Sequence, residues 1–406
     1  MSAPPSRLGV ALVGYAFMGA AHSQAWRTAG RFFDLPYEVD RRVLCGRDRE
    51  AATAAASRLG WTEVVTDWRA LLDRDDVQLV DICTPGDSHA EIAVAALEAG
   101  KHVLCEKPLA NTVAEAERMA ATAARAAGRG VRSMVGFNYR RVPALALARK
   151  LVAAGRLGEI RHVRAQYLQD WIVDPTFPLV WRLQKERAGS GALGDIGAHI
   201  VDAAQFVIGQ RIRGVNAMTE TFVRRRPLPT ASAGLSASAG SDATGPVTVD
   251  DAALFLARFD GGALGSFEAT RFATGRKNAL RLEVNGSKGS LVFDFDAMNE
   301  LQVYDGSAPA DEAGFTRIQV TEPTHPYMAA WWPPGHLIGY EHTFTHEVVD
   351  LLGDIAAGRD PEPSFADGLQ VQRVLAAVEE SAADEGRWTG CGDDPAAGTA
   401  ATNRRL

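Results

Sequence analysis

Lys107 is the residue whose type and position most strongly suggest chemistry in this sequence. It belongs to Glu106-Lys107-Pro108, which follows the apolar run His102–Cys105, and the chain has only six lysines beside thirty-seven arginines. A lysine supplies a compact ammonium group that can lose its proton, whereas an arginine stays charged. The tripeptide therefore favours a site that uses such a group at a strand end. A solvent-exposed lysine, or a plain turn made by the proline, is the simpler interpretation.

Asp195 and His199 form a second group that could do chemistry. They are four positions apart, so on a helix both side chains lie on one face, one turn apart. An imidazole titrates near neutral pH and can accept a proton, and a carboxylate beside it can hold a hydroxyl group. A capping aspartate followed by a surface histidine is the alternative. Four glycines indicate a tight loop that leads into the helix: Gly189, Gly191, Gly194 and Gly197.

Residues 7–137 alternate between strand-like and helix-like segments. Apolar runs typical of buried strands lie at 8–13, 42–45, 77–83, 102–105 and 131–137. Helix-like segments separate them at 20–28, 49–59, 89–99 and 113–127. Strands that alternate with helices predict a parallel, doubly wound sheet of the Rossmann type. We therefore expect an α/β protein whose first domain spans 7–137 and follows a short disordered lead at 1–6.

A glycine-rich turn follows the first predicted strand and opens the first predicted helix. Gly14 and Gly19 hold the outer glycine positions of a dinucleotide-binding turn, and Ala16 replaces the middle glycine. The pyrophosphate of a dinucleotide needs a tight turn, a small residue for close approach and free N–H groups at a helix start. We therefore expect these three residues, with Phe17 and Met18, to bind it. A generic tight turn is the alternative.

Two further loops are expected to complete a cofactor site. Gly46 stands where a carboxylate usually binds the ribose of NAD, and Arg47 could pair with the extra phosphate of NADP or stack on adenine. The acidic residues that follow disfavour a phosphate, so NAD is favoured, with NADP as the alternative. Thr84, Pro85 and His89 follow the strand 77–83, at the sheet edge where ligands bind. A plain loop that caps the next helix is compatible with this interpretation.

The pattern changes near residue 138. Alternating strand candidates lie at 160–169, 214–222, 252–259, 262–270, 279–284 and 289–293, and turn signals link neighbouring ones. They predict an α+β second domain over 138–388, built on an open, largely antiparallel sheet, with amphipathic helices at 341–355 and 368–383. Residues 227–246 and 389–406 are rich in small residues and are expected to be a flexible insertion and a disordered tail. An open sheet face favours a homo-oligomer, either a dimer or a tetramer.

The bulk composition restricts the partners. A formal net charge of −7 argues against a nucleic-acid surface, and no apolar run is long enough to span a membrane. The first residues lack the apolar core of a signal peptide. The four cysteines have neither zinc-site nor disulfide spacing, so we expect no metal and a cytoplasmic protein.

In this order, the motifs resemble the glucose–fructose oxidoreductase/inositol dehydrogenase/MocA (Gfo/Idh/MocA) family over roughly residues 7–388. The resemblance is carried by the turn 14–19, by Thr84-Pro85, by Glu106-Lys107-Pro108 and by Gly194-Asp195-Ile196-Gly197-Ala198-His199. Segments 17–23 and 331–336 are similar to its levoglucosan dehydrogenase-like branch. The resemblance implies a Rossmann domain, a second domain with an open sheet, and NAD(P)-dependent dehydrogenase activity on sugars and cyclitols. Ala16 and Gly46 depart from the family pattern, which affects the choice of cofactor.

The resemblance also implies roles for the candidate residues. Lys107 corresponds to the family lysine near the nicotinamide, next to Glu106, and Asp195 and His199 correspond to the pair in the substrate pocket. We expect His199 to accept the hydroxyl proton and Asp195 to hold a hydroxyl group. Lys107 would stabilise the developing alkoxide or act as the base itself. Further candidates for substrate contact are Tyr139, Gln169, Trp171, Arg182 and His336.

The expected reaction is hydride transfer between NAD(P) and a secondary hydroxyl group of a sugar, anhydrosugar or cyclitol. Because a fold does not fix an activity, two alternatives stay open. One is an NAD-dependent glycosidase that oxidises its substrate transiently and consumes no added cofactor. The other is a cofactor-binding regulatory protein without turnover.

Overall fold

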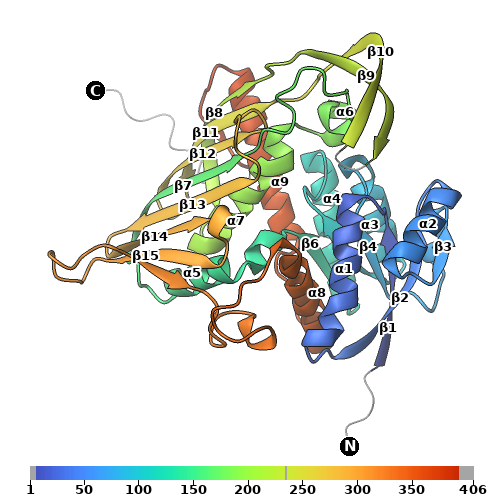
Figure 1. Ribbon diagram of the computed structural model, residues 1–406, viewed down its shortest axis with the longest axis horizontal. Helices are drawn as coiled ribbons and strands as arrows, with labels where there is room; N and C mark the ends of the chain where they lie inside the picture. Colours follow the sequence, from blue (N-terminus) through green and yellow to red (C-terminus); the bar gives the residue numbers. More distant parts are fainter. Residues whose placement is uncertain (1–5, 234–235, 393–406) are drawn as a thin grey trace, which may run out of the picture.

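The computed structural model describes residues 6–233 and 236–392, which form two lobes around two sheets (Figure 1). The first sheet is parallel and has the strand order β3-β2-β1-β4-β5-β6. Its strands are β1 (Ser6–Val13), β2 (Tyr37–Cys45), β3 (Glu63–Val65), β4 (Leu79–Ile82), β5 (His102–Glu106) and β6 (Ser133–Gly136). This sheet confirms the predicted Rossmann-type fold.

Helices cover both faces of the first sheet. One face carries α1 (Phe17–Phe32) and α2 (Arg49–Leu59), and the other carries α3 (His89–Glu98) and α4 (Val113–Ala127). Successive strand residues enter the two cores in turn, which is why these strands are apolar throughout. The strand order reverses at β1, between β2 and β4, so the loops after β1 and β4 diverge and open a crevice.

The second sheet has the order β16-β15-β14-β13-β7-β12-β11-β8-β17, and every neighbouring pair except β7 with β12 is antiparallel. Its first four strands in the chain are β7 (Ile160–Leu168), β8 (Ile212–Glu220), β11 (Ala252–Phe259) and β12 (Leu264–Thr270). The others are β13 (Ala279–Gly286), β14 (Gly289–Asp294), β15 (Glu300–Asp305), β16 (Phe315–Gln319) and β17 (Thr389–Gly390). The open, largely antiparallel sheet was predicted correctly.

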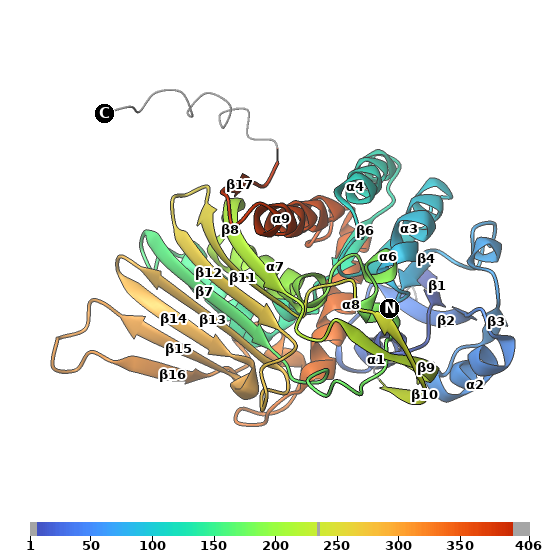
Figure 2. The same ribbon diagram turned by 90° about the horizontal axis from the view of Figure 1, so that it is seen from above.

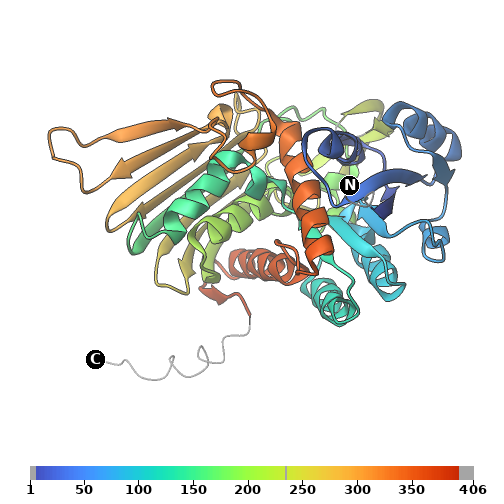
Figure 3. The same ribbon diagram turned by 90° about the horizontal axis from the view of Figure 1, so that it is seen from below.

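Only one face of the second sheet is covered by helices. Helices α5 (Pro143–Ala153), α7 (Ala198–Ile208) and α9 (Phe365–Ala383) lie on that face, and the opposite face is open (Figure 2). Helix α8 (Tyr340–Ala357) lies between the lobes, beside α1 (Figure 3). The C-terminal part of the chain therefore returns to the Rossmann sheet.

The described residues within 227–246 form paired strands where the sequence predicts a flexible insertion; 234–235 lie outside the described residues. The strands are β9 (Arg225–Ala233) and β10 (Ser236–Pro246), a hairpin at the top of Figure 1. The small residues of this segment cannot build a core, but the hairpin is anchored at its base by the fully buried guanidinium of Arg226. This group donates hydrogen bonds to the carbonyl groups of Ile172, Asp174 and Phe177. The ordering interaction therefore comes from a loop distant in sequence.

The two ends of the described chain also differ from the prediction. Ser6 begins β1 instead of ending a disordered lead, and Thr389 and Gly390 pair with β8 instead of beginning a disordered tail. The backbone hydrogen bonds of the sheets extend these strands beyond their apolar residues. The rest of both predictions, at 1–5 and 393–406, lies outside the described residues. Within the described part of the chain, no helix combines the length and apolar character needed to cross a membrane.

Candidate active site

A cavity of about 580 Å³ lies between the carboxyl ends of β1, β4 and β5 and the second lobe. The predicted cofactor residues in its wall are Ala16, Phe17, Met18, Thr84, Pro85, His89, Glu106 and Lys107. The predicted substrate residues in its wall are Tyr139, Gln169, Trp171, Arg182, Asp195 and His199. The fold therefore brings most of the candidate residues into one cavity.

The turn after β1 has the backbone that a pyrophosphate requires. Gly14 has a φ of +99°, and a Cβ there would lie 2.7 Å from the Cys83 carbonyl oxygen. A Cβ on Gly19 would lie 2.1 Å from the Gly14 carbonyl oxygen, so α1 packs closely on the turn. No side chain caps the start of α1 at Ala16, which leaves N–H groups for an anion. The residues present therefore fit a dinucleotide.

Gly46 and Arg47 lie outside the cavity wall, at the end of β2. They remain beside the turn, because the N–H of Gly14 donates to the carbonyl group of Cys45, the last residue of β2. A Cβ on Gly46 would lie 2.1 Å from the ring of Tyr15, so this ring fills the space in which an acidic side chain would begin. Arg47 is exposed.

His336, which the sequence predicts to contact substrate, also lies outside the cavity wall. It is exposed, and its Nδ1 lies 2.8 Å from the carbonyl oxygen of Pro333. The loop that contains it packs on the C-terminal end of α1, where the rings of Trp331 and Phe32 have centroids 4.5 Å apart. This aromatic contact holds the loop away from the cavity.

Lys107 follows β5 directly and reaches across to the second lobe. Its ammonium group donates a hydrogen bond to the backbone carbonyl of Asp195 and lies 3.7 Å from Asp195 Oδ1. Its own backbone N–H donates to Glu106 Oε2 at 3.1 Å. The side chain of Lys107 therefore links the Rossmann sheet to the π-helical turn Leu193–Gly197, which contains Asp195.

Asp195 is surrounded by three cationic side chains from different elements: Lys107, Arg182 and Arg271. Arg271 is fully buried, and its Nη1 lies 3.5 Å from Asp195 Oδ2. Burial raises the pKa of Asp195, but the three cations outweigh burial and keep its pKa below the usual value. The carboxylate is therefore charged at neutral pH and can accept a hydrogen bond from a hydroxyl group. Arg271 was not predicted, although it follows β12 as Lys107 follows β5.

His199 lies in the first turn of α7, and its ring packs against three aromatic rings. The centroid distances are 6.1 Å to Phe137, 4.6 Å to Tyr139 and 6.0 Å to Tyr167. Burial, with a smaller effect of the Lys107 charge, lowers the pKa of His199 well below 6.5. Its Nδ1 has no hydrogen-bond partner among the described residues. A neutral imidazole in a cavity wall can accept a proton from a hydroxyl group.

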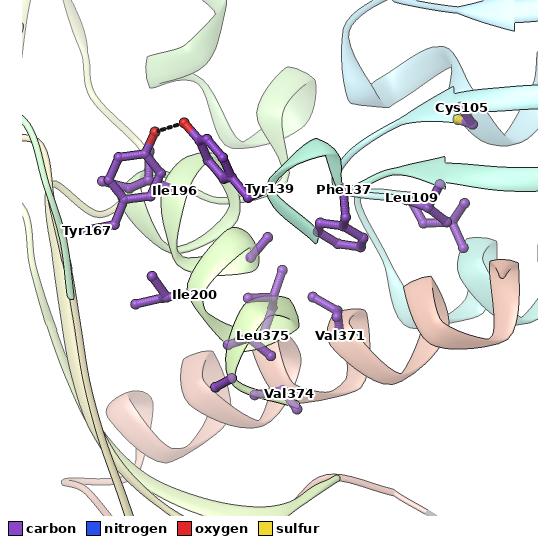
Figure 4. Packing of buried hydrophobic residues seen from close by; sticks show 14 of the residues in the cluster. Cys105, Leu109, Phe137, Tyr139, Tyr167, Ile196, Ile200, Val371, Val374 and Leu375 are labelled. Atoms are coloured by element: carbon purple, nitrogen blue, oxygen red, sulfur yellow. Dashed lines mark hydrogen bonds between the residues drawn. The ribbon is translucent and has the colours of Figure 1, made fainter. Parts of the chain in front are cut away.

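Hydrogen bonds connect the polar side chains on the substrate side of the cavity. The hydroxyl oxygens of Tyr139 and Tyr167 are 2.6 Å apart (Figure 4). Tyr167 donates to Asn278 Oδ1 at 2.7 Å, and Gln169 donates to the same oxygen at 2.8 Å. Trp171 Nε1 donates to Gln169 Oε1 at 3.0 Å. Tyr167 and Asn278 were not predicted; the only signal was that Tyr167 lies in the predicted strand 160–169 and Asn278 directly precedes the predicted strand 279–284.

His89 lines the cavity and also holds two loops together. Its two ring nitrogens lie 2.8 Å from the carbonyl oxygen of Thr84 and 3.0 Å from that of Pro108. The ring therefore joins the loops that follow β4 and β5, and it shapes the cavity wall by holding these loops together.

Comparisons with known proteins match this geometry. Residues 8–137 match a family model described as an oxidoreductase family with an NAD-binding Rossmann fold, and residues 145–292 match the GFO/IDH/MocA C-terminal domain. The chain belongs to the Gfo/Idh/MocA family. It is an NAD-dependent oxidoreductase, and the family predicted from the motifs is confirmed.

Several members of the Gfo/Idh/MocA family are similar over most of the chain. Levoglucosan dehydrogenase of Pseudarthrobacter phenanthrenivorans is 45% identical over 382 residues, which cover 93% of this chain and 97% of the relative. An oxidoreductase domain protein from Kribbella flavida, known from a crystal structure, is 69% identical in sequence. The two structures superpose with a TM-score of 0.91, over 96% of this chain and 100% of the other. A levoglucosan dehydrogenase in complex with NADH and levoglucosan is 44% identical, with a TM-score of 0.89 and the same coverage.

Proposed function

We propose that this protein oxidises a secondary hydroxyl group of an anhydrosugar or a closely related sugar, with NAD as the hydride acceptor. The observation that carries the proposal is the convergence of Lys107, Asp195 and His199 on the cavity that begins at the dinucleotide turn. Among sugars and cyclitols, the anhydrosugars are favoured because a levoglucosan dehydrogenase is similar over nearly the whole length of the chain.

The three side chains divide the work according to their charges. NAD, when bound, supplies the hydride acceptor. His199 is neutral and accepts the hydroxyl proton, while the charged Asp195 accepts a hydrogen bond from a hydroxyl group and orients the sugar. The ammonium group of Lys107, held by Asp195, stabilises the negative charge that develops on the reacting oxygen. Lys107 as the base itself is the alternative assignment.

A substrate panel tests the proposal. The purified protein is mixed with NAD or NADP and with levoglucosan, monosaccharides or inositols, and absorbance at 340 nm is followed. We expect NADH formation with the highest kcat/KM for levoglucosan. A glycosidase that oxidises transiently would form product without a net absorbance change, and a regulatory protein would form no product. Either result would contradict the proposal.

We also infer that the open face of the second sheet binds a second copy of the chain. Four large apolar side chains are exposed on this face: Met218, Leu254, Leu256 and Leu264. The first three lie on the adjacent strands β8 and β11, where Met218 and Leu254 are register partners. A contiguous apolar patch of this kind is typical of an interaction surface. Its strands are antiparallel and continuous, so a symmetric partner can cover the whole face.

A further inference from the structure

His22, in α1, is buried between two carboxylates. Its Nδ1 lies 2.9 Å from Asp81 Oδ1, on β4, and its Nε2 lies 2.9 Å from Glu106 Oε1, at the end of β5. Each of the three side chains is at most 5% exposed. A neutral imidazole has one N–H group and can donate to only one carboxylate, whereas an imidazolium donates to both. The two short distances therefore favour the charged ring.

Asp81 has two further polar neighbours besides His22. Trp26 Nε1 donates to its Oδ2 at 2.7 Å, and the Cys83 thiol lies 3.6 Å from its Oδ1. Burial alone would lower the pKa of His22, but the charge of Asp81 outweighs burial and holds that pKa well above its usual value. Together these contacts fix one side of the ring and leave its Nε2 hydrogen for Glu106.

Helix α8 contributes two further titratable groups near this ring, Tyr340 and Glu347, in addition to the Cys105 thiol on β5. Burial raises the pKa of Tyr340 well above its usual value and the pKa of Glu347 to about 8. Neither group therefore carries a full negative charge at neutral pH. The imidazolium therefore interacts mainly with the carboxylates of Asp81 and Glu106.

Glu106 connects this buried pair to the cavity. Its Oε1 faces His22, and its Oε2 accepts the backbone N–H of Lys107. Gly136, in the adjacent strand β6, leaves the space that this carboxylate occupies, since a Cβ there would lie only 3.2 Å from Glu106 Oε1. Glu106 itself lines the cavity.

A metal ion is the competing explanation for this cluster. His22, Asp81 and Cys83 each offer one ligand atom, and these atoms lie within 4.8 Å of one another. Both ring nitrogens of His22 already lie at hydrogen-bond distance from carboxylate oxygens, 2.9 Å in each case, which leaves neither nitrogen directed at an ion. The direct hydrogen bonds between His22 and the carboxylates therefore account better for the arrangement.

We propose that His22 is a positioning residue of the active site: as an imidazolium held by Asp81, it fixes the Glu106 carboxylate, which in turn fixes the backbone that carries Lys107. Only the kinetic consequence rests on the proposed function. The hydrogen-bond chain itself can be measured without substrate or cofactor.

Two amide variants separate the two sides of the ring. The amide of His22→Gln lies near the position of Nε2 and can still donate to Glu106, whereas that of His22→Asn lies near Nδ1 and reaches only Asp81. With ¹⁵N-lysine, the whole chain gives six lysine amide signals, and Lys107→Arg identifies the one of interest. We expect the Lys107 amide to exchange about tenfold faster in His22→Asn and to change little in His22→Gln.

The protonation state of the His22 ring is measured separately in the wild-type protein. With ¹⁵N-histidine, we expect both ring nitrogens of His22 to be protonated at neutral pH. Trp26→Phe is the control, because it removes another donor to Asp81 and leaves the Glu106 contact in place. If His22→Asn does not fold, Asp81→Asn removes the anion that holds the ring, and it is expected to speed exchange of the Lys107 amide in the same way.

Kinetics complete the test when a sugar is turned over. We expect kcat of His22→Asn to fall about tenfold below that of His22→Gln, with a much smaller change in KM, because positioning acts on the reacting groups. A neutral His22 ring, stoichiometric zinc in the purified protein, or equal Lys107 amide exchange in the two variants would overturn the proposal. An inactive protein that passes both NMR tests would overturn the proposed function alone.

Discussion

At the scale of single residues, the cavity keeps one acid charged and one base neutral a single helical turn apart. Three cations hold Asp195 as a carboxylate, and burial holds His199 as a neutral imidazole. Groups whose pKa values are pushed apart in this way are suited to different steps of one reaction. The charge pattern therefore assigns hydrogen bonding of a hydroxyl group to Asp195 and acceptance of its proton to His199.

Replacement of His199 tests this assignment. In His199→Ala, we expect kcat to fall about 10²–10⁴-fold, because proton transfer loses its positioned acceptor. The Kd for NADH, measured by fluorescence titration, should change little, since the dinucleotide turn is on the other lobe. His336→Ala is the matched control, because His336 is exposed and outside the cavity wall, and its kcat should equal that of the wild type. A His199→Ala enzyme with nearly full activity would refute the assigned role.

At the scale of secondary structure elements, a strand could be predicted from the sequence when its own apolar residues stabilise it. It could not when a contact with a distant residue does. The long apolar strands of the first sheet are visible in the sequence because each one is buried on both faces. Strands β15 and β16 were missed because they are short, and β16 is also largely exposed. The β9–β10 hairpin was missed because Arg226, rather than an apolar face, anchors it.

The residues of the site divide in the same way, into those that belong to local motifs and those that reach the cavity through the packing of distant segments. Lys107, Asp195 and the Gly14 turn belong to local motifs, so their residue types and spacing predicted them. Arg271 and Asn278 meet the cavity through the packing of distant strands, for which a single sequence has no local signal. His336 lies outside this cavity although its sequence context predicts a substrate contact, and its loop packs on α1 through the Trp331–Phe32 contact.

Arg226 allows a test of how the hairpin is held. In Arg226→Met, we expect the protein to lose about 2–3 kcal/mol of unfolding free energy, because three carbonyl groups, one of them buried, lose a charged donor. We also expect faster proteolysis within 225–246. Arg224→Met is the control, since the Arg224 side chain is 81% exposed. Denaturant unfolding measures both variants, and equal stability would show that the hairpin needs no such anchor.

At the scale of the whole molecule, Glu347 couples the contact between the lobes to pH. It lies on α8, fully buried, with no hydrogen-bond partner for either oxygen among the described residues. Burial raises its pKa from 4.5 to about 8. Between these values the folded protein keeps a proton that the unfolded chain releases, so stability falls as pH rises from about 4.5 to 8.

Glu347→Gln removes this dependence, because an amide of the same shape does not ionise. We expect the Tm of the variant minus that of the wild type to increase steadily from pH 5 to pH 8, which corresponds to a free-energy change on the order of a few kcal/mol. Glu380→Gln, on the exposed side of α9, should give a difference that does not change with pH. A constant difference for Glu347→Gln would mean that the buried carboxyl is ionised or hydrated throughout this range.

We propose that the open sheet face determines the oligomeric state of the protein in solution. Leu256 is 61% exposed and Met218 is 74% exposed, on a face that the helices of the same chain leave uncovered. Burial of this patch against a second copy is worth roughly 25 cal/mol per Å² of apolar surface. We therefore expect the wild type to be a dimer or tetramer by light scattering, and Leu254→Glu/Leu256→Glu to be a monomer that still binds NADH. Phe315→Glu, on the edge strand β16, should leave the mass unchanged. A wild-type monomer at micromolar concentration would mean that this face serves another partner.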